Sequence, residues 1–376
     1  MDVAYVSNVV FPFVKGGAEK RIHEIGRRLA ADGHEVTVYG RHFWDGPAEM
    51  AHEGMQLRAV APERKLYDDD QRSITEAIDF AARVLRPLRR HCDDHDVVVA
   101  SVFPYFPVLS AAIARWRTDT PLVTTWHEVW LDHWDDYLDR FALGGKAVER
   151  LVAKTPQRPT AVSGVTADRL ARIGPNRDEI TVIPNGIDFE QIRATPPAED
   201  GYDVLFAGRL IPEKGVDTLL RAFDRVTTDR DLTLGIVGDG PEAERLRSTA
   251  ATLDHSDRID FLGFLDDYED VLGQMRAADV FAAPSVREGF GITYAEAMAA
   301  DCTVIAAQHP ESAASEVIGE AGFVVPPSVD GVADALARAV SGKRPATDPV
   351  ERARQFDWDA VATQAAETYR VAIARS

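Results

Sequence analysis

Two successive series of strand-like runs alternate with amphipathic stretches along the chain, and this alternation is the strongest constraint on its fold. The first series opens with "DVAYVSN" and resumes, after a helix-like stretch, with "EVTVYG". The second opens with "VLFAG" and "LTLGIVG" and ends with "GFVVPP". Apolar runs separated by amphipathic segments are typical of parallel sheets that are covered by helices. The sequence therefore predicts an α/β protein with two Rossmann-like domains.

A stretch without sustained periodicity separates the two series. Residues 189–202 carry two adjacent prolines, several acids and a glycine, which is typical of a linker. The chain of 376 residues also exceeds the length at which a single hydrophobic core usually stops growing. We therefore expect domains at 1–188 and 203–355. The last stretch, 356–376, predicts a helix that crosses back and packs on the first domain.

The formal charge of −19 argues against a nucleic-acid partner, whose phosphates would be repelled over most of the surface. Residues 1–190 carry 24 basic and 29 acidic side chains, whereas residues 191–376 carry 18 and 32. The first half is thus the better candidate to approach an anionic partner. Only seven of the 42 basic residues are lysines, a composition that resembles salt-adapted archaeal proteins, although a GC-rich genome would also favour arginine.

Several features favour a cytoplasmic protein. The chain opens on a strand-like run instead of a charged and apolar leader. Cys92 and Cys302 lie far apart without the spacing of metal ligands, which suits a reducing compartment. Pro104 and Pro107 divide the longest uncharged stretch, Val97–Ala114, into a predicted strand, turn and helix, so it is not expected to span a membrane.

Glycine turns followed by helices are candidate phosphate sites in parallel α/β sheets. In the first domain, Gly16 and Gly17 lie just before a predicted helix, although a lone glycine pair also fits a plain loop. In the second domain, a strand ends at Gly208 and is followed by Arg209 and Lys214. These cations would clamp two phosphates and stabilise the charge on a departing diphosphate. A pair of surface cations is the alternative.

The stretch "REGFGITYAEAMA" places Glu288 before a glycine turn and Glu296 within a predicted helix. Gly289 and Gly291 would let the backbone approach a ligand, and N–H groups from Gly291 to Thr293 would point at a phosphate. Carboxylates repel phosphates, so their useful targets are hydroxyl groups. A nucleotide sugar has hydroxyls at both ends of its diphosphate.

Two weaker signals complete the predicted donor site. Gly238 lies in the strand-to-helix turn "VGDGPE", and the strand end "FLGFLD" would present backbone groups of Phe264 and Leu265 to the edge of a base. The full set of candidates is Gly16, Gly17, Gly208, Arg209, Lys214, Gly238, Phe264, Leu265, Glu288, Gly289, Phe290, Gly291, Ile292, Thr293 and Glu296.

Four segments, "IPNGID", "GRLIPEKG", "GDGP" and "PSVREGFGITYAEAMA", resemble the retaining glycosyltransferases of family 4, which have the GT-B fold. The resemblance covers nearly the whole chain. It implies transfer of a sugar from a nucleotide-diphosphate sugar with its anomeric configuration kept. It also implies a central cleft between the two Rossmann-like domains, and no bound metal or cofactor, the nucleotide sugar being a substrate.

The resemblance also implies a role for particular residues. By match to the family's motifs, Arg209 and Lys214 hold the diphosphate, Glu288 contacts donor-sugar hydroxyls and Glu296 binds the ribose. His127, in "TTWHEVW", matches the family's histidine near the reaction centre. The predicted catalytic set is therefore His127, Arg209, Lys214 and Glu288.

The acceptor side departs from the family. Glu128 follows His127 where the family often has aspartate, and the aromatic, acidic segment "WHEVWLDHWDDYLDRF" lies where an acceptor would enter. The acceptor is thus open between a glycan, a lipid-linked glycan and a small molecule. The sequence leaves the nucleotide (UDP, GDP, ADP or TDP), the sugar and the linkage open as well.

The helix-like stretch "DFAARVLRPLRRH" indicates peripheral contact with the inner face of the cell membrane. Its spacing places several of Arg83, Arg86, Arg89 and Arg90 on one side of a helix, although a solvated helix face is the alternative. Two other functions remain open at this stage. One is a GT-B-shaped nucleotide-sugar epimerase, and the other is a non-catalytic subunit that binds a nucleotide sugar.

Overall fold

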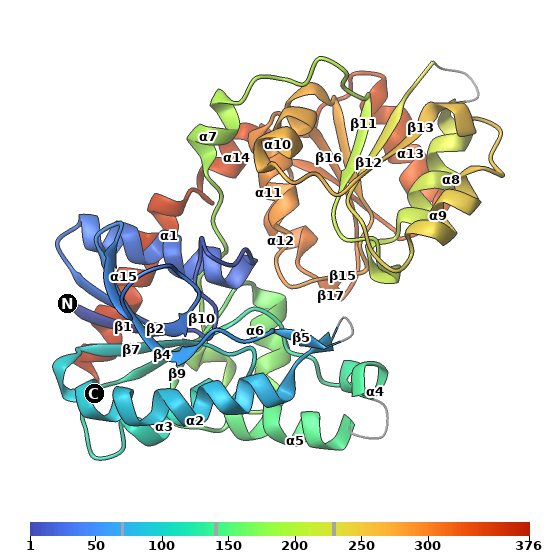
Figure 1. Cartoon of the computed structure of the whole chain (residues 1–376). Helices are drawn as coiled ribbons and strands as arrows, with labels where there is room; N and C mark the ends of the chain where they lie inside the picture. The colour runs from blue at the N-terminus through green and yellow to red at the C-terminus, as the bar shows by residue number, and fades with distance from the viewer. Residues whose placement is uncertain (69–70, 139–141, 228–230) are drawn as a thin grey trace. The chain divides into compact units, whose positions relative to one another are not determined.

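Two units, each built around its own sheet, make up the computed structural model, which describes residues 1–68, 71–138, 142–227 and 231–376 (Figure 1). Unit 1 comprises Met1–Asn185 and Trp358–Ser376, and unit 2 comprises Gly186–Asp357. Both sheets are mainly parallel and have helices packed against them. The predicted two-domain α/β class is confirmed.

The sheet of unit 1 has eight strands in the order β10-β9-β8-β7-β1-β2-β4-β3. Their bounds are β1 (Asp2–Val6), β2 (Glu35–His42), β3 (Glu49–His52), β4 (Met55–Pro62), β7 (Val97–Ser101), β8 (Leu122–Trp126), β9 (Arg158–Ala161) and β10 (Thr181–Val182). The expectation of a wholly parallel sheet is wrong at one edge, because β3 pairs antiparallel with β4. Glu53 and Gly54, at φ 46° and 81°, form the tight turn that joins these two strands.

Helices cover both faces of this sheet. They are α1 (Gly17–Ala31), α2 (Ile74–His91), α3 (Phe106–Ala114), α4 (His133–Leu138), α5 (Ala142–Ala153), α6 (Gly164–Ala171) and α15 (Trp358–Ala374), with short turns η1 (Cys92–Asp94) and η3 (Arg177–Glu179) and a hairpin of β5 (Tyr67–Asp68) and β6 (Gln71–Arg72). The strand-turn-helix prediction for residues 97–114 is confirmed by β7 and α3.

Alternate residues of the central strand β1 enter two separate cores. Ala4 and Val6 pack in the core that also holds residues of α2 and α3. Val3 and Tyr5 pack in the core that holds residues of α1 and α15. This is the expected result of side chains alternating across a strand whose two faces are both covered.

The last helix, α15, belongs to unit 1 although unit 2 precedes it in the chain. It packs beside α1 and buries Trp358, Val361 and Tyr369 in the shared core. The Tyr369 hydroxyl lies 3.2 Å from that of Tyr5. Two segments from opposite ends of the sequence thus complete one face of the same sheet.

The sheet of unit 2 has six strands in the order β13-β12-β11-β14-β16-β18, all parallel. Their bounds are β11 (Val204–Ala207), β12 (Leu234–Val237), β13 (Ile259–Gly263), β14 (Val280–Ala283), β16 (Thr303–Ala307) and β18 (Gly322–Val325), and a separate parallel pair is formed by β15 (Arg287–Glu288) and β17 (Glu311–Ser312). Every strand that the second series predicts is present.

Its helices are α7 (Phe189–Ala194), α8 (Val216–Thr227), α9 (Ala243–Ala250), α10 (Tyr268–Ala277), α11 (Ile292–Ala299), α12 (Ala314–Ile318), α13 (Val329–Val340) and α14 (Pro349–Arg354), with turns η4 (Pro212–Lys214) and η5 (Ser256–Arg258). The stretch 189–202, predicted as a linker, begins with the short helix α7. Asp188 caps this helix by accepting the N–H of Gln191 at 3.2 Å. Phe189 and Ile192 are buried, which secures a helix too short to show periodicity in sequence.

Candidate functional site

Glycine turns follow the parallel strands of unit 2 at the edge where a ligand is expected. Gly208 and Gly238 follow β11 and β12 with φ of 159° and 130°. The N–H of Gly238 donates to the Gly263 carbonyl at 2.7 Å, and a Cβ on Gly238 would overlap the Gly208 carbonyl oxygen. The turns therefore pack backbone against backbone, and glycine at position 238 is required by this packing alone.

The two predicted phosphate-binding cations occupy the loop after β11. Arg209 is exposed, and its guanidinium has no hydrogen bond or ion pair among the described residues. Lys214 ends η4, and its side chain is 22% exposed. Gly215 follows with φ 66°, a left-handed conformation that favours glycine. It allows the chain to turn directly from the lysine into α8.

Backbone contacts bring Lys214 next to Glu288, although the two residues lie 74 positions apart. The N–H of Val286 donates to the Glu213 carbonyl at 2.9 Å, which joins η4 to the segment before β15. The Lys214 ammonium then forms an ion pair with the Glu288 carboxylate, whose side chain is 12% exposed. An ammonium has three N–H donors, so Lys214 retains donors for phosphate oxygens while Glu288 orients it.

The glycine turn before α11 contains one left-handed residue. Gly291 adopts φ 82° and precedes the first residue of α11 without a side-chain cap. Ile292 and Thr293, in the first turn, are partly exposed, and Gly289 lies in the loop before them. Uncapped N–H groups and the helix dipole make such an end attractive to an anion.

Phe290 differs from its neighbours because its side chain anchors the turn to the core. Its side chain is buried and packs edge-on against Phe356, with ring centroids 5.4 Å apart. Because the ring is buried, the predicted donor contact of Phe290 would be made by its backbone.

Glu296 lies in the second turn of α11 and is buried. The Tyr268 hydroxyl, at the start of α10, donates to its carboxylate. Burial and the Glu296 charge raise the pKa of Tyr268 well above its ordinary value, so the phenol stays protonated and keeps donating. Tyr268 thus fixes the orientation of Glu296, and no pattern in the sequence pointed to it.

Phe264 and Leu265 follow β13 in the same unit. Phe264 exposes 73% of its surface, whereas Leu265 is half-buried. The sequence predicts backbone contacts with a base at this point. An exposed aromatic ring adds a surface on which a base can stack.

The remaining candidates lie in unit 1. Gly16 precedes α1 in an extended conformation, and a Cβ there would overlap the carboxylate of Glu19 in the first turn of the helix. Gly17 has open space where a Cβ would be. His127 directly follows β8 and is half-buried. The candidates therefore divide between two units, with Gly16, Gly17 and His127 in unit 1 and the others in unit 2.

Arg21, on α1, is a neighbour of His127 that the sequence analysis missed. It is buried and donates to the carbonyl of Ile183 and to Asn185 Oδ1, each at 3.1 Å, and also to the carbonyl of Pro184. Arg21 and His127 line a cavity of about 10 Å³, which is at the lower limit of the space that can hold one water molecule. Burial and the Arg21 charge lower the pKa of His127 to about 3.

The depressed pKa of His127 predicts how stability changes with pH. Below about pH 6.5 the unfolded chain protonates this histidine, whereas the folded chain does not until about pH 3. The free energy of unfolding should therefore fall as the pH drops through this window, and His127→Gln should make that fall shallower. Denaturant unfolding of both proteins across the window measures the difference. If NMR shows that the His127 imidazole of the folded protein titrates at its ordinary pKa, the lowered pKa is contradicted.

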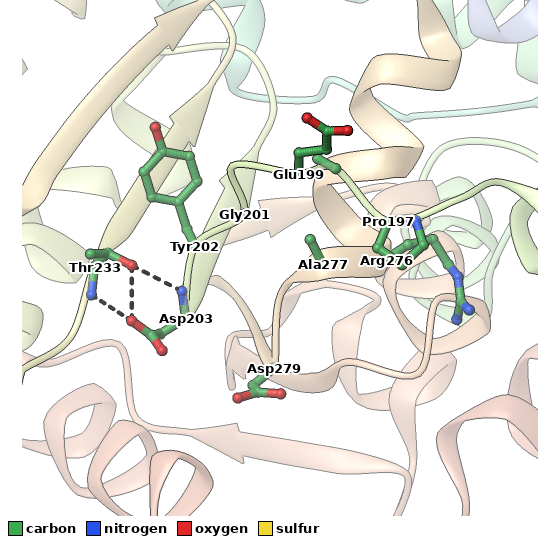
Figure 2. A pocket seen from close by; sticks show the side chains of 10 residues that line it. Pro197, Glu199, Gly201, Tyr202, Asp203, Thr233, Arg276, Ala277 and Asp279 are labelled. Carbon is green, nitrogen blue, oxygen red and sulfur yellow. Dashed lines mark hydrogen bonds between the residues drawn. The ribbon is translucent and has the colours of Figure 1, made fainter.

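A hollow of about 450 Å³ lies at the opposite, amino ends of the strands in unit 2 (Figure 2). Asp203 and Asp279, which precede β11 and β14, line it together with Arg276. Asp203 accepts hydrogen bonds from the N–H and the hydroxyl of Thr233, both at 2.8 Å. Its carboxylate is thus used to tie two strand starts together, and the hollow is separate from the glycine turns.

Within the described residues, no three His, Cys, Asp or Glu side chains are grouped so as to hold a metal ion. In the same part of the chain, no helix combines the length and apolar character needed to cross a bilayer.

Known families match both parts of the chain. Residues 15–191 match Glycosyltransferase Family 4, and residues 188–356 match Glycosyl transferases group 1. The chain therefore belongs to the group 1, family 4 glycosyltransferases.

Relatives extend over the whole chain or half of it. Glycogen synthase of Mycobacterium tuberculosis is 29% identical over 99% of this chain and 95% of its own length. The MMP alpha-(1->4)-mannosyltransferase of Mycolicibacterium hassiacum is 25% identical over 96% of each chain. Phosphatidyl-myo-inositol mannosyltransferase of Mycolicibacterium smegmatis is 37% identical over 50% of each chain.

Solved structures share the fold. Sucrose-phosphate synthase from Thermosynechococcus elongatus matches with a TM-score of 0.78 at 21% identity, covering 100% of both chains. Anabaena HepE in complex with UDP and glucose matches with a TM-score of 0.73 at 21% identity, covering 99% of this chain and 100% of that one. The fold is that of the GT-B glycosyltransferases.

Proposed function

We propose that this glycosyltransferase moves a sugar from a nucleotide-diphosphate sugar to an acceptor hydroxyl, with retention of configuration and without a metal ion. The observation that carries the proposal is the arrangement at the carboxyl edge of the unit 2 sheet. Lys214, oriented by Glu288, and the uncapped start of α11 lie there on adjoining turns. Anabaena HepE, whose solved structure has a similar fold, is in complex with UDP and glucose.

Each part of this arrangement has a chemical task. Arg209 and Lys214 bind the diphosphate and stabilise the charge that collects on it as it leaves. The start of α11 donates N–H groups to a phosphate. Glu288 accepts hydrogen bonds from donor-sugar hydroxyls, and Glu296, held by Tyr268, accepts them from the ribose. The charges required for a leaving diphosphate are thus supplied by side chains.

The proposed reaction takes place on one face of the sugar. The bond between the anomeric carbon and the diphosphate oxygen breaks, and its electron pair stays on the diphosphate. The acceptor oxygen bonds to the anomeric carbon on that same face, and the acceptor proton passes to a diphosphate oxygen. A neutral His127 fits a hydrogen-bonding role toward the sugar better than that of a charged acid.

The acceptor is proposed to bind unit 1 and to be a glycan or a lipid-linked glycan. The transferred sugar is proposed to be a hexose, which makes the enzyme a hexosyltransferase. Relatives named glycogen synthase and alpha-(1->4)-mannosyltransferase, which match nearly the whole chain, support a saccharide acceptor.

The test is a two-stage assay in high salt. UDP-, GDP-, ADP- and TDP-sugars are first ranked by thermal shift, since a ligand of the native state raises apparent stability by mass action. The best donor is then incubated with and without saccharide acceptors, with a chelator present, and products are identified by NMR. Transfer that keeps the anomeric configuration is expected. Epimer formation without acceptor, or donor binding without hydrolysis or transfer, would contradict the proposal.

We also infer a cytoplasmic location with peripheral membrane contact through α2. Arg86, Arg89 and Arg90 are exposed on this helix, whereas Arg83 pairs with Asp79 at 2.9 Å. We expect the protein to co-sediment with anionic liposomes at low ionic strength, because such lipids attract exposed cations and salt screens that attraction.

Changing the four arginines 83, 86, 89 and 90 to glutamine should abolish this co-sedimentation. Neutral liposomes are the control. Equal sedimentation with neutral and anionic liposomes, or no loss in the quadruple variant, would leave a solvated helix face as the role of these residues.

A further inference from the structure

An aromatic cluster lies in unit 1 beyond the carboxyl ends of the neighbouring strands β7 and β8, in the loops that follow them and in the first turn of α4. Phe103 and Trp130 stack with ring centroids 5.7 Å apart and an interplanar angle of 10°. Trp134 packs against Trp130 at 5.0 Å and against Tyr105 at 5.7 Å. Tyr105 and Trp134 are buried, whereas Phe103 is 37% exposed. The cluster thus has a buried base, on which the half-buried Trp130 and the exposed Phe103 lie.

A buried carboxylate fixes this cluster. Glu149, on α5, is 1% exposed and accepts hydrogen bonds from the Tyr105 hydroxyl at 2.9 Å and from Trp134 Nε1 at 3.3 Å. It also accepts the backbone N–H groups of Trp130 at 2.7 Å and Leu131 at 3.0 Å. A buried charge is costly unless such donors compensate it. Here four donors from both loops converge on one carboxylate.

The backbone between the two tryptophans depends on the same carboxylate. Leu131 adopts φ 50°, a left-handed conformation that residues other than glycine rarely take. Such a conformation persists where the surroundings enforce it. The Glu149 bond to the Leu131 N–H provides that constraint and sets the position of Trp130 one residue earlier.

We propose that Phe103 and Trp130 form a stacking platform for a pyranose ring of the acceptor, with Glu149 as a positioning residue. This inference rests on the proposed function. A pyranose has a face of C–H groups, which the electron-rich face of an aromatic ring attracts, and an edge of hydroxyl groups. Trp130 lies three residues after His127 in the loop that follows β8. Ligands bind at this edge of parallel sheets, beyond the carboxyl ends of the strands.

The surroundings favour a saccharide over a lipid chain or a protein partner. The same loop carries the exposed Glu128 and Asp132, and Asp132 pairs with Lys146 at 3.2 Å. Charged groups beside two stacked rings are typical of sites in which a few polar groups orient a ligand over an apolar surface. A protein or lipid interface would need a wider continuous apolar area.

The experiment titrates the whole protein with maltotriose and with a mannose disaccharide, without nucleotide, and follows saturation-transfer NMR and tryptophan fluorescence. Trp130→Ala and Phe103→Ala should each weaken saccharide binding about tenfold. Trp130→Phe, which keeps a ring, should retain most of it. The control is Trp116→Ala, which removes a 64% exposed tryptophan of unit 1 outside the cluster and should change nothing.

Two further measurements separate the platform from folding effects. Nucleotide binding, assigned to unit 2, should be unchanged in every variant, which checks that the protein is folded. Glu149→Gln should raise the acceptor KM and leave the donor KM unchanged, because an amide accepts fewer of the four hydrogen bonds. An altered donor KM in this variant would mean a purely structural role and would overturn the positioning assignment.

The outcomes also distinguish the platform from the proposed function. Saccharide binding that depends on Trp130, in a protein without transfer activity, would overturn the proposed function alone. Transfer with an unchanged acceptor KM in Trp130→Ala would overturn the platform alone. Binding of an alkyl chain in place of saccharides would overturn the platform and make the cluster an apolar docking surface.

Discussion

Replacement of Lys214 by alanine is expected to lower kcat on the order of 10²-fold or more, and Arg209→Ala should have a similar effect. The contacts that these cations make strengthen as negative charge collects on the departing diphosphate, so they contribute more to the transition state than to the bound donor. The donor KM should therefore change much less than kcat. Steady-state kinetics with the donor identified by thermal shift measures both values.

Two controls test whether the loss arises from the chemistry. Arg221→Ala removes a cation on α8 that pairs with Asp217 at 3.0 Å, and it should leave turnover unchanged. The variant Lys214→Ala, Glu288→Gln removes the ion pair without leaving an unpaired carboxylate. If the pair served the fold alone, this double variant would regain activity. Near-normal turnover in both Lys214→Ala and Arg209→Ala would show that these two cations do not stabilise the departing diphosphate.

Much of the fold could be predicted because its signals are local. The four inner strands of unit 2, β11, β12, β14 and β16, are mostly apolar runs that are buried throughout. Such runs stand out against the amphipathic helices between them. The exceptions are the short elements. The helix α7 offers only Phe189 and Ile192 as apolar contacts, and β3 is a four-residue edge strand set by the turn at Glu53 and Gly54. Neither is long enough to display a period.

The candidate site could be predicted only to the level of its turns. Gly208 and Arg209 follow from the order of residues in the loop after β11, and the start of α11 follows from the residues of the turn before it. The partners of the carboxylates do not. Glu288 meets a lysine 74 positions away, Glu296 meets Tyr268 28 positions away, and the two aromatic loops meet on Glu149. These contacts depend on which strands are neighbours in the sheet, and short stretches of sequence do not predict the strand order.

Neutralising Glu288 and neutralising Glu296 should affect different steps of donor binding and turnover. Glu296→Gln is expected to weaken binding of the free nucleotide diphosphate about 10- to 100-fold, the loss associated with one hydrogen bond to a charged group. The amide can still accept from Tyr268, so the side chain should keep its orientation. Glu288→Gln should leave the free nucleotide diphosphate unaffected, because its proposed contacts are with the donor sugar.

Calorimetry with the nucleotide diphosphate and with the intact donor, followed by turnover measurements, separates the two roles. Glu288→Gln should lower kcat with the donor sugar, since it loses the charged acceptor for sugar hydroxyls and also releases Lys214 from its ion pair. Tyr268→Phe is the matched control for Glu296, because it removes only the hydroxyl that holds the carboxylate. It should weaken nucleotide binding less than Glu296→Gln does, and in the same direction. Equal losses for Glu288→Gln and Glu296→Gln with the free nucleotide would show that this division of roles between the carboxylates is wrong.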